Sequence, residues 1–454
     1  IIFCVPYTSM AEGERGGFSG SLSFILTAAG TAVGLGCIWR FPYLTAEHGG
    51  GIFILCYVAI LLTLGITLLA VEFAIGRKTG VGVLDAFGKL NPKFGFLGII
   101  CVLVCALSQP YFAVLGACIT KYGFLYMSGG GEAAAEAGFY ATYIASNFEP
   151  LLWLLFYIAI AAVIVYFGVQ AGIERVCKIV MPIEVFLIAV LAIDCLSLPG
   201  AWEGLVYFLA PNFDNFTPDA VLAALGQVFY SLSLGLGVMV TFGSYLSKKV
   251  NVIKSSCSTA FFTFLVSMLA GALIVPASYL YTNGNPAAVG SGGIFESLPM
   301  VFDMMPFGTV TGGAFFVLLA LAALTSTIAE FEVIVTALKD RLGFSRLKGV
   351  IIMSVYTLIL GGFISLGYGA LNWIQIGDMY LLEFFDFMSG TILMPLMVFF
   401  TCILVAYFVK PKVILDEMNL KEKGVIRKGM WVMLKFVCPA CIAIIFITNI
   451  IGMF

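Results

Sequence analysis

Charged residues are scarce in this sequence. Of 454 residues, 11% are charged and 61% are hydrophobic, and the mean hydropathy is +1.07. Soluble domains carry about 25% charged residues and need polar cover on their surfaces. The composition therefore excludes a soluble globular protein and a disordered chain. A net charge of −2 offers no basic field for nucleic acid, so a polytopic membrane protein remains.

Histidine is almost absent as well, since His48 is the only one in the chain. Clusters of imidazole groups that bind metals or move protons are therefore excluded, and no nucleophile stands out beside a base. Twelve cysteines are present, but the one C-x-x-C pair, Cys438 and Cys441, lies in an apolar run beside Pro439. Buried cysteine usually packs as a small hydrophobic residue. The sequence predicts neither an enzyme nor a disulfide framework.

Long apolar runs make up most of the chain. A membrane-spanning helix needs about twenty apolar residues. The predicted fold class is an all-α polytopic membrane protein with about eleven transmembrane helices. The expected spans are 20–43, 48–76, 96–126, 150–168, 175–198, 219–246, 254–282, 309–338, 347–367, 378–408 and 430–452.

Lysine and arginine are nearly missing from one side of these spans. With the N-terminus in the cytoplasm, 21 of the 23 Lys and Arg residues fall on the cytoplasmic side, and only Arg40 and Lys121 lie towards the outside. Positive residues favour the cytoplasmic side of a membrane. We therefore expect a multi-pass protein of a cell inner membrane with a cytoplasmic N-terminus.

Glycines interrupt two spans at matching depth. Gly-Leu-Gly occurs at 34–36 in the first span and again at 235–237 in the sixth. Five spans per copy invert the second copy, so the pattern predicts a 5+5 inverted repeat with broken helices 1 and 6. The alternative is that these glycines only let helices pack closely. The expected division is 1–13 (leader or added segment with the cytoplasmic N-terminus), 14–200 (first repeat), 201–408 (second repeat) and 409–454 (cytoplasmic loop and helix 11).

Several further motifs follow in a fixed order. They are Ala29–Gly36, Trp39–Tyr43, Glu72–Arg77, Leu324–Thr327 and Ser389–Thr391. Over about residues 14–450 the chain resembles the neurotransmitter:sodium symporter family, in its bacterial leucine-transporter-like branch. The resemblance implies alternating access, Na+ as the coupling ion and a small amino-acid-like substrate. Eleven spans are typical of prokaryotic members.

The resemblance implies one complete sodium site. Its ligands are backbone carbonyls of the first helix and hydroxyls of the eighth: Gly30, Val33, Ala322, Thr325 and Ser326. Oxygen ligands of this kind suit a hard cation. The alternative is that the two hydroxyls bond only to their own helix.

A second sodium site of the family is expected to be lost here. It needs amide side chains where this chain has Cys37 and, by alignment, Phe262, and neither supplies a suitable oxygen. Val266 aligns with the position of a nearby carboxylate or chloride ligand, although Tyr57 and Gln227 remain. We therefore expect one sodium ion and neither a second sodium nor a chloride site.

The resemblance also implies a substrate pocket and two gates. The outer gate pairs Arg40 with Asp386 under a lid formed by Tyr230. The inner gate pairs Arg15 with Asp340, braced by Tyr245, although Arg15 and Asp340 would also serve as ordinary flanking charges. The expected pocket comprises Thr31, Ala32, Gly34, Leu35, Gly36, Leu107, Tyr111, Tyr230, Ser231, Ser233, Leu236, Ser326 and Glu330.

Acidic residues inside spans indicate function by default. Glu72 is expected to brace the unwound sixth helix, and Glu184 has no assigned role. Glu330 stands where relatives often carry an apolar residue, so it weakly favours a substrate with a polar or cationic side chain. The alternative is that it bonds only to neighbouring hydroxyls. Gly34 replaces the aspartate of amine transporters, which favours an amino acid over an amine.

Two other functions share this sequence evidence. A transport-silent receptor could use the same fold to sense an amino acid, and a transporter could carry a non-amino-acid amine. A channel is disfavoured because gates on opposite sides suit alternating access. The expected partners are the substrate, sodium and the lipid bilayer, with the chain a monomer or homodimer and no nucleic acid involved.

Overall fold

The structure is a computed structural model. It describes residues 17–289, 294–305, 307–377, 379–409, 411–418, 420 and 424–451. The segment expected at 1–13 and the gate residue Arg15 lie outside these ranges. Within them the chain forms helices and only isolated β-bridges, so the predicted all-α class is confirmed.

Every expected span is helical. Within the described ranges, nine helices are long and apolar enough to cross a membrane, and a bent pair forms a tenth crossing. The nine are Gly51–Thr79 (α3, η3 and α4), Pro92–Met127 (η4 and α6), Glu149–Tyr166 (α9), Val169–Leu196 (η5 and α10), Val252–Tyr281 (α14), Gly308–Leu342 (α16), Arg346–Leu366 (α17), Leu381–Phe408 (α18, η9, α19 and η10) and Val425–Thr448 (α21, η11 and α22).

Two spans are broken, and these are the first and the sixth. The first comprises α1 (Ser21–Ala32), then η2 (Gly36–Arg40) and α2 (Phe41–Glu47), with a bend of 58° between the halves. The sixth comprises α12 (Pro218–Ser231) and α13 (Val238–Gly243). The two breaks contain the Gly-Leu-Gly sequences. Each broken helix therefore opens a run of five spans.

Shorter helices complete the chain between the spans. These shorter helices are α5 (Val83–Leu90), α7 (Gly131–Ala135), α8 (Phe139–Ala145), α11 (Ala201–Leu209), η6 (Phe213–Asn215), η7 (Pro286–Val289), α15 (Ser297–Asp303) and α20 (Pro411–Glu417).

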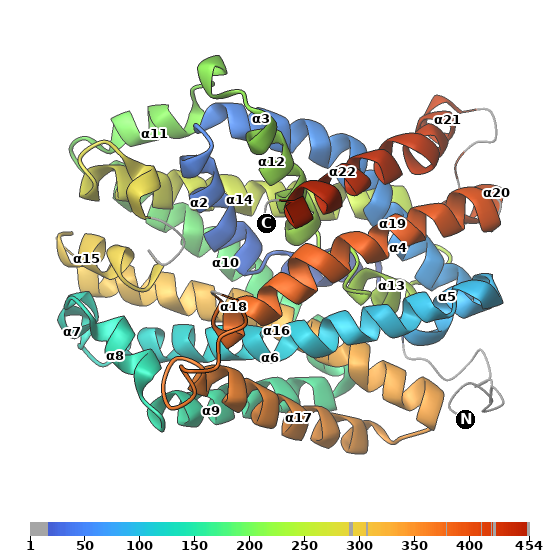
Figure 1. The fold of residues 1–454 in the computed structure, drawn as a ribbon, viewed down its shortest axis with the longest axis horizontal. Coiled ribbons are helices and arrows are strands. Elements are labelled where there is room, and N and C mark those ends of the chain that lie inside the picture. Colours follow the sequence, from blue (N-terminus) through green and yellow to red (C-terminus); the bar gives the residue numbers. More distant parts are fainter. Residues whose placement is uncertain are drawn as a thin grey trace.

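Helices α6 (Phe96–Met127) and α16 form the centre of the molecule. They run side by side along its long axis, and α9 and α17 lie together at one edge (Figure 1). Helix α16 ends at Leu342, and Gly343 caps it with a φ of 66°, which suits glycine. The broken helices pack around this central pair, with α1 against α16. This arrangement brings both breaks to the interior.

Glycine permits the close packing of α4 (Ile66–Thr79) and α13. A Cβ atom at Gly243 would lie 2.5 Å from the Phe73 carbonyl oxygen, and a Cβ atom at Gly76 would meet the Val240 carbonyl. These backbones can approach so closely only where side chains are absent. The short second half of the sixth span is therefore held against the second span.

We expect Gly243→Ala to lower the melting temperature of the purified protein in detergent, because the Phe73 carbonyl is backbone and cannot move away cheaply. Gly226→Ala is the matched control, since nothing lies within 4 Å of a Cβ atom there. In helix α12 this control should keep or raise stability by about 0.5–1 kcal/mol. Equal melting temperatures for the two variants would contradict the packing argument.

Candidate functional site

The break in the first helix removes two carbonyl groups from the helical ladder. The Gly34 amide donates to the Ala32 carbonyl at 3.0 Å rather than to Gly30. The Cys37 amide donates to the Gly34 carbonyl at 3.1 Å rather than to Val33. The carbonyls of Gly30 and Val33 are thus outside the ladder, and these are the two predicted as sodium ligands.

The Ser326 hydroxyl of α16 contacts the first helix at this break, whereas the Thr325 hydroxyl bonds within its own helix. Ser326 donates from Oγ to the Thr31 carbonyl at 3.3 Å and to the Ala322 carbonyl at 3.2 Å. Thr325 Oγ1 donates to the same Ala322 carbonyl at 3.0 Å. A hydroxyl that donates one hydrogen bond keeps lone pairs for a cation. The set predicted to bind sodium therefore contains only oxygen atoms, which fits a hard cation.

The first sodium site of the family differs from this set. The Cys37 thiol donates to the Ala32 carbonyl at 3.5 Å, so one expected ligand already accepts a hydrogen bond. The Thr263 hydroxyl, on the buried face of α14, donates to the Thr259 carbonyl of its own helix at 2.9 Å. Neither Cys37 nor Thr263 is an amide, so the two amide side chains of that site are replaced, while the Thr263 hydroxyl keeps lone pairs.

The alignment of the seventh span was wrong by one residue. The Cys37 thiol and the Tyr57 hydroxyl both lie beside Ser231 and Ser267. Phe262 is half-buried and packs on the exposed Phe261 instead. The helix face towards the site therefore carries Thr263 and Ser267, not Phe262 and Val266. A residue four positions further along a helix returns to the same face, so both corrections have one cause.

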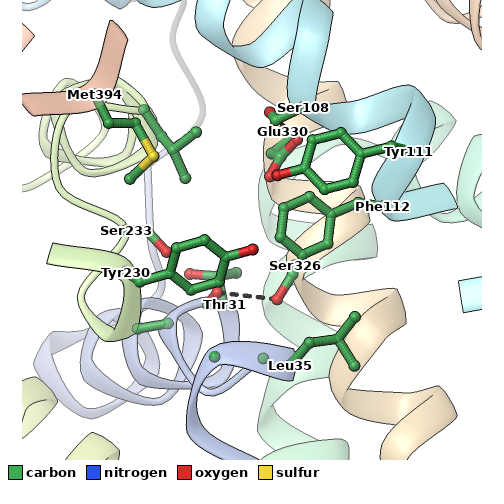
Figure 2. A pocket seen from close by; sticks show the side chains of 14 residues that line it. Thr31, Leu35, Ser108, Tyr111, Phe112, Tyr230, Ser233, Ser326, Glu330 and Met394 are labelled. Carbon is green, nitrogen blue, oxygen red and sulfur yellow. Dashed lines mark hydrogen bonds between the residues drawn. The ribbon is translucent and has the colours of Figure 1, made fainter. Parts of the chain in front are cut away.

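A small cavity lies between the two breaks, α6 and α16 (Figure 2). Tyr230 faces Tyr111 and Phe112 across it, and Glu330 lies beside Ser108. Its walls are mixed, with hydroxyl groups, backbone and aromatic rings. The lining residues are Thr31, Ala32, Gly34, Leu35, Gly36, Ser108, Tyr111, Phe112, Tyr230, Ser233, Leu236, Ser326, Glu330 and Met394.

Two predicted pocket residues lie elsewhere. Leu107 is half-buried and does not line the cavity, whereas its neighbour Ser108 does. Ser231 accepts a hydrogen bond from Gln227 Nε2 at 2.9 Å and belongs to the group around Cys37. Phe112 follows directly after Tyr111, so the ambiguity of one residue in the third span could have indicated it. Met394 comes from the tenth span, and no sequence signal marked it.

The Glu330 carboxylate contacts both a neighbouring hydroxyl and the cavity. Ser108 Oγ donates to Glu330 Oε2 at 2.7 Å, and the carboxylate also lines the cavity. The side chain is 3% exposed. One hydroxyl does not use the acceptor capacity of a carboxylate, which has about four lone-pair sites. The geometry is therefore compatible with both hypotheses, that Glu330 meets the substrate and that it bonds only to a neighbouring hydroxyl.

The break in the sixth helix is held by a carboxylate and a thiol. Ser233, Gly235 and Gly237 all have positive φ angles, of 52°, 82° and 77°. The Gly235 amide donates to Glu72 Oε1 at 2.8 Å. Cys105 Sγ donates to the Leu236 carbonyl at 3.0 Å. Glu72 therefore braces the unwound segment as its position predicted.

The outer gate is arranged differently from the expected ion pair. Tyr111 donates from its hydroxyl to Asp386 Oδ1 at 2.8 Å. The guanidinium carbon of Arg40 lies 4.9 Å from the ring centre of Tyr230. The Nη1 atom of Arg40 donates to Gln227 Oε1 at 3.4 Å. In the described part of the chain no direct ion pair joins Arg40 to Asp386, and each of them contacts a tyrosine instead. The predicted residues meet, but through Tyr111 and Tyr230.

On the cytoplasmic side, Asp340 Oδ2 accepts a hydrogen bond from the Gly82 amide at 2.9 Å. Tyr245 donates to Glu332 Oε1 at 3.1 Å, and Arg346 forms an ion pair with the same carboxylate. Burial raises the pKa of Asp85, which pairs with Arg341 at 3.3 Å. Polar contacts thus close this side too, while Arg15 lies outside the described residues.

Comparisons with known proteins identify the family. The sodium:neurotransmitter symporter family matches residues 15–130 and 145–454. The chain belongs to this family. The symporter is 33% identical to a sodium-dependent transporter of Haemophilus influenzae, covering 96% of this chain and 98% of the relative. It is 34% identical to the sodium-dependent transporter YhdH of Bacillus subtilis, covering 98% and 99%.

A solved structure supports the same assignment. The crystal structure of MhsT in complex with L-phenylalanine aligns with a TM-score of 0.88 and 34% identity, covering 96% of this chain and 100% of MhsT. The fold, the sodium-dependent symporter class and the absence of enzymatic relatives agree with the predictions from sequence. The symporter is therefore a multi-pass membrane transporter.

We expect Tyr111→Phe to lower substrate affinity and uptake, because it removes the hydroxyl that holds Asp386. A hydrogen bond to a charged group contributes about 1.5–3 kcal/mol. Tyr126→Phe on the same helix is the control, since the Tyr126 hydroxyl is buried without a partner among the described residues. Wild-type uptake in both Asp386→Asn and Arg40→Gln would contradict the outer gate.

Proposed function

We propose that this symporter imports a small amino acid by alternating access, driven by one sodium ion. The observation that carries the proposal is the meeting of both helix breaks at one buried cavity, beside a set of oxygen ligands. Polar contacts close the cavity on both sides, as alternating access requires. The lysine and arginine bias favours an inner membrane with a cytoplasmic N-terminus.

The second half of the first helix supports an amino acid as substrate. Leu35 and Gly36 begin this half, and the first amides of a helix have no intrahelical acceptor. Such amides attract a carboxylate. Gly34 carries no acid for a substrate amine, and the Ser326 hydroxyl fills the space where its side chain would begin. The L-phenylalanine bound to MhsT is an amino acid too.

Glu330 supports a substrate with a polar or cationic side chain. It lines the same cavity as Tyr111 and Tyr230, so it can meet the side chain of a bound amino acid. A buried carboxylate needs a partner or a proton. A cationic or hydrogen-bond-donating side chain would supply the partner, whereas an aliphatic one would not.

One sodium ion follows from the donor sets. The group near Thr325 consists of carbonyl and hydroxyl oxygens, whereas the other group contains the Cys37 thiol, a poor sodium ligand, which donates to the Ala32 carbonyl. Ser267 provides a hydroxyl at the chloride position that the alignment had assigned to Val266. A buried chloride would still need a neighbouring cation. We therefore keep chloride and a second sodium out of the proposal.

A transport-silent receptor is the second candidate, because the occluded cavity would also suit a sensor. Uptake of a radiolabelled amino-acid panel into proteoliposomes, with and without a sodium gradient, separates the two. Sodium-driven accumulation supports the symporter. Binding without accumulation supports the receptor, and whether the chain acts as monomer or homodimer is read from the same purified sample.

The sodium prediction is that uptake depends hyperbolically on sodium, with a Hill coefficient of about one, as a single site requires. Thr325→Val combined with Ser326→Ala should nearly abolish sodium-dependent uptake. Thr263→Val, at the other sodium position of the family, is the control and should leave sodium-dependent uptake unchanged, because the proposal places no ion there. Uptake in sodium gluconate should equal that in sodium chloride. A clearly sigmoidal sodium dependence would refute the single site.

The substrate prediction concerns Glu330. Glu330→Gln should weaken binding of a cationic or polar amino acid by about 1–3 kcal/mol, the scale of a charge-assisted hydrogen bond. Glu330→Ile should shift preference towards leucine-like substrates. Ser108→Ala is the companion variant, since it removes only the neighbour of Glu330. If the wild type prefers leucine and Glu330→Ile leaves the ranking unchanged, Glu330 does not face the substrate.

A further inference from the structure

Glu184 is the one buried acidic side chain in the described spans with no partner for either oxygen. It lies in the middle of α10 (Arg175–Leu196), is 0% exposed, and both carboxylate oxygens are buried without a hydrogen bond. Other buried or half-buried acidic groups of the described spans have at least one partner, among them Glu72 with Gly235, Glu330 with Ser108, Glu332 with Arg346, Asp194 with Thr311 and Asp386 with Tyr111.

The surroundings of Glu184 contain no described group that could compensate a negative charge. The ionisable groups that interact with it are the thiols of Cys37 and Cys177. Helix α10 packs against α1, α11, α14, α16 and η5 (Val169–Glu174). Several titratable groups of those elements have other partners: Glu174, Tyr207, Glu330 and Glu332. The others lie elsewhere, with Glu203 on α11 and Lys254, Cys257, Tyr279 and Tyr281 near the ends of α14.

An isolated carboxylate in such a place must be neutralised. Removing an ionised carboxylate from water without a partner is so costly that the group takes up a proton instead. A sodium ion would be the other solution, but the ionisable groups that interact with Glu184 are thiols, and a thiol is a poor ligand for a hard cation. The chemistry around Glu184 therefore favours a proton over a metal ion.

Helix α1 covers the face of α10 that carries Glu184. A Cβ atom at Gly30 of α1 would lie 3.5 Å from Cys177 and 3.8 Å from Met181. Met181 and Glu184 are three residues apart and therefore share a helix face. At its cytoplasmic end, α1 is tied to the same region, since the Ser19 amide donates to Glu174 Oε2 at 3.0 Å. Movement of α1 away from α10 would admit cytoplasmic water to this face.

We propose that Glu184 is a proton-binding site of the transport cycle, protonated while α1 is closed and deprotonated when α1 opens to the cytoplasm. The O–H bond of the carboxyl breaks on opening, and the proton passes to water. Closing requires a proton from water to restore the neutral acid, because the charged form cannot be buried. The inference rests on the proposed function for its cycle, but not for the protonation of the closed state.

The closed state is tested directly by infrared spectroscopy of the purified full chain. The carboxylic-acid C=O band should lose intensity in Glu184→Gln relative to wild type. Glu203→Gln, at an exposed position of α11, is the control and should leave the band unchanged. An unchanged band in Glu184→Gln would show that the group is ionised and would overturn the proposal.

The cycle is tested by uptake into proteoliposomes at varied internal pH. Raising the internal pH should slow closing, so uptake should fall, approaching about tenfold per pH unit above the midpoint if one group titrates. Glu184→Gln should lose this dependence, and Glu184→Asp should keep it with a shifted midpoint. A pH dependence that persists in Glu184→Gln would overturn the proposal.

Binding measurements in detergent separate the possible failures. Glu184→Gln should bind amino acid with the same sodium requirement as wild type. An increased sodium requirement would assign a sodium ion to Glu184 and overturn the proton. If the wild type binds no amino acid with sodium, the proposed function fails, while the infrared result still decides whether Glu184 is protonated.

Discussion

The need to satisfy every backbone polar group inside a membrane governs this structure. An unbroken helix meets that need within itself, but a break frees carbonyls and amides that must find other partners. The chain breaks two helices and places both breaks in the interior, against α6 and α16. There the freed groups include the carbonyls predicted as sodium ligands. The same constraint explains why Glu72 and the thiol of Cys105 lie where the sixth helix unwinds.

Much of this arrangement could be predicted from the sequence because glycine marks it. Gly34 and Gly237 lie in the two breaks, and the apolar runs between charged ends located the spans. The hydroxyls of Thr325 and Ser326 were also predicted, because the resemblance to the symporter family assigns them to a sodium site. These signals are local, and each belongs to a short stretch of chain.

The remaining parts depend on registers and distant neighbours. The alignment of helix α14 moved by one residue and placed Phe262 rather than Thr263 on the inner face, although Thr259, Thr263 and Ser267 recur at a four-residue spacing on the buried face. In the outer gate each of the two charges contacts a tyrosine, and the sequence does not indicate that these contacts replace a direct ion pair. Met394 enters the cavity from the tenth span. Only the packing of distant helices determines such contacts.

Ser326 occupies two environments at once. It is both a predicted sodium ligand and part of the cavity wall, and its hydroxyl touches the first helix at Thr31. An ion that orders this hydroxyl also orders the wall against which a substrate lies. Thermodynamic linkage then works in both directions: whatever affinity sodium adds to substrate binding, the substrate returns to sodium in equal measure. Through one side chain, sodium binding and substrate binding would thus depend on each other without any long-range signal.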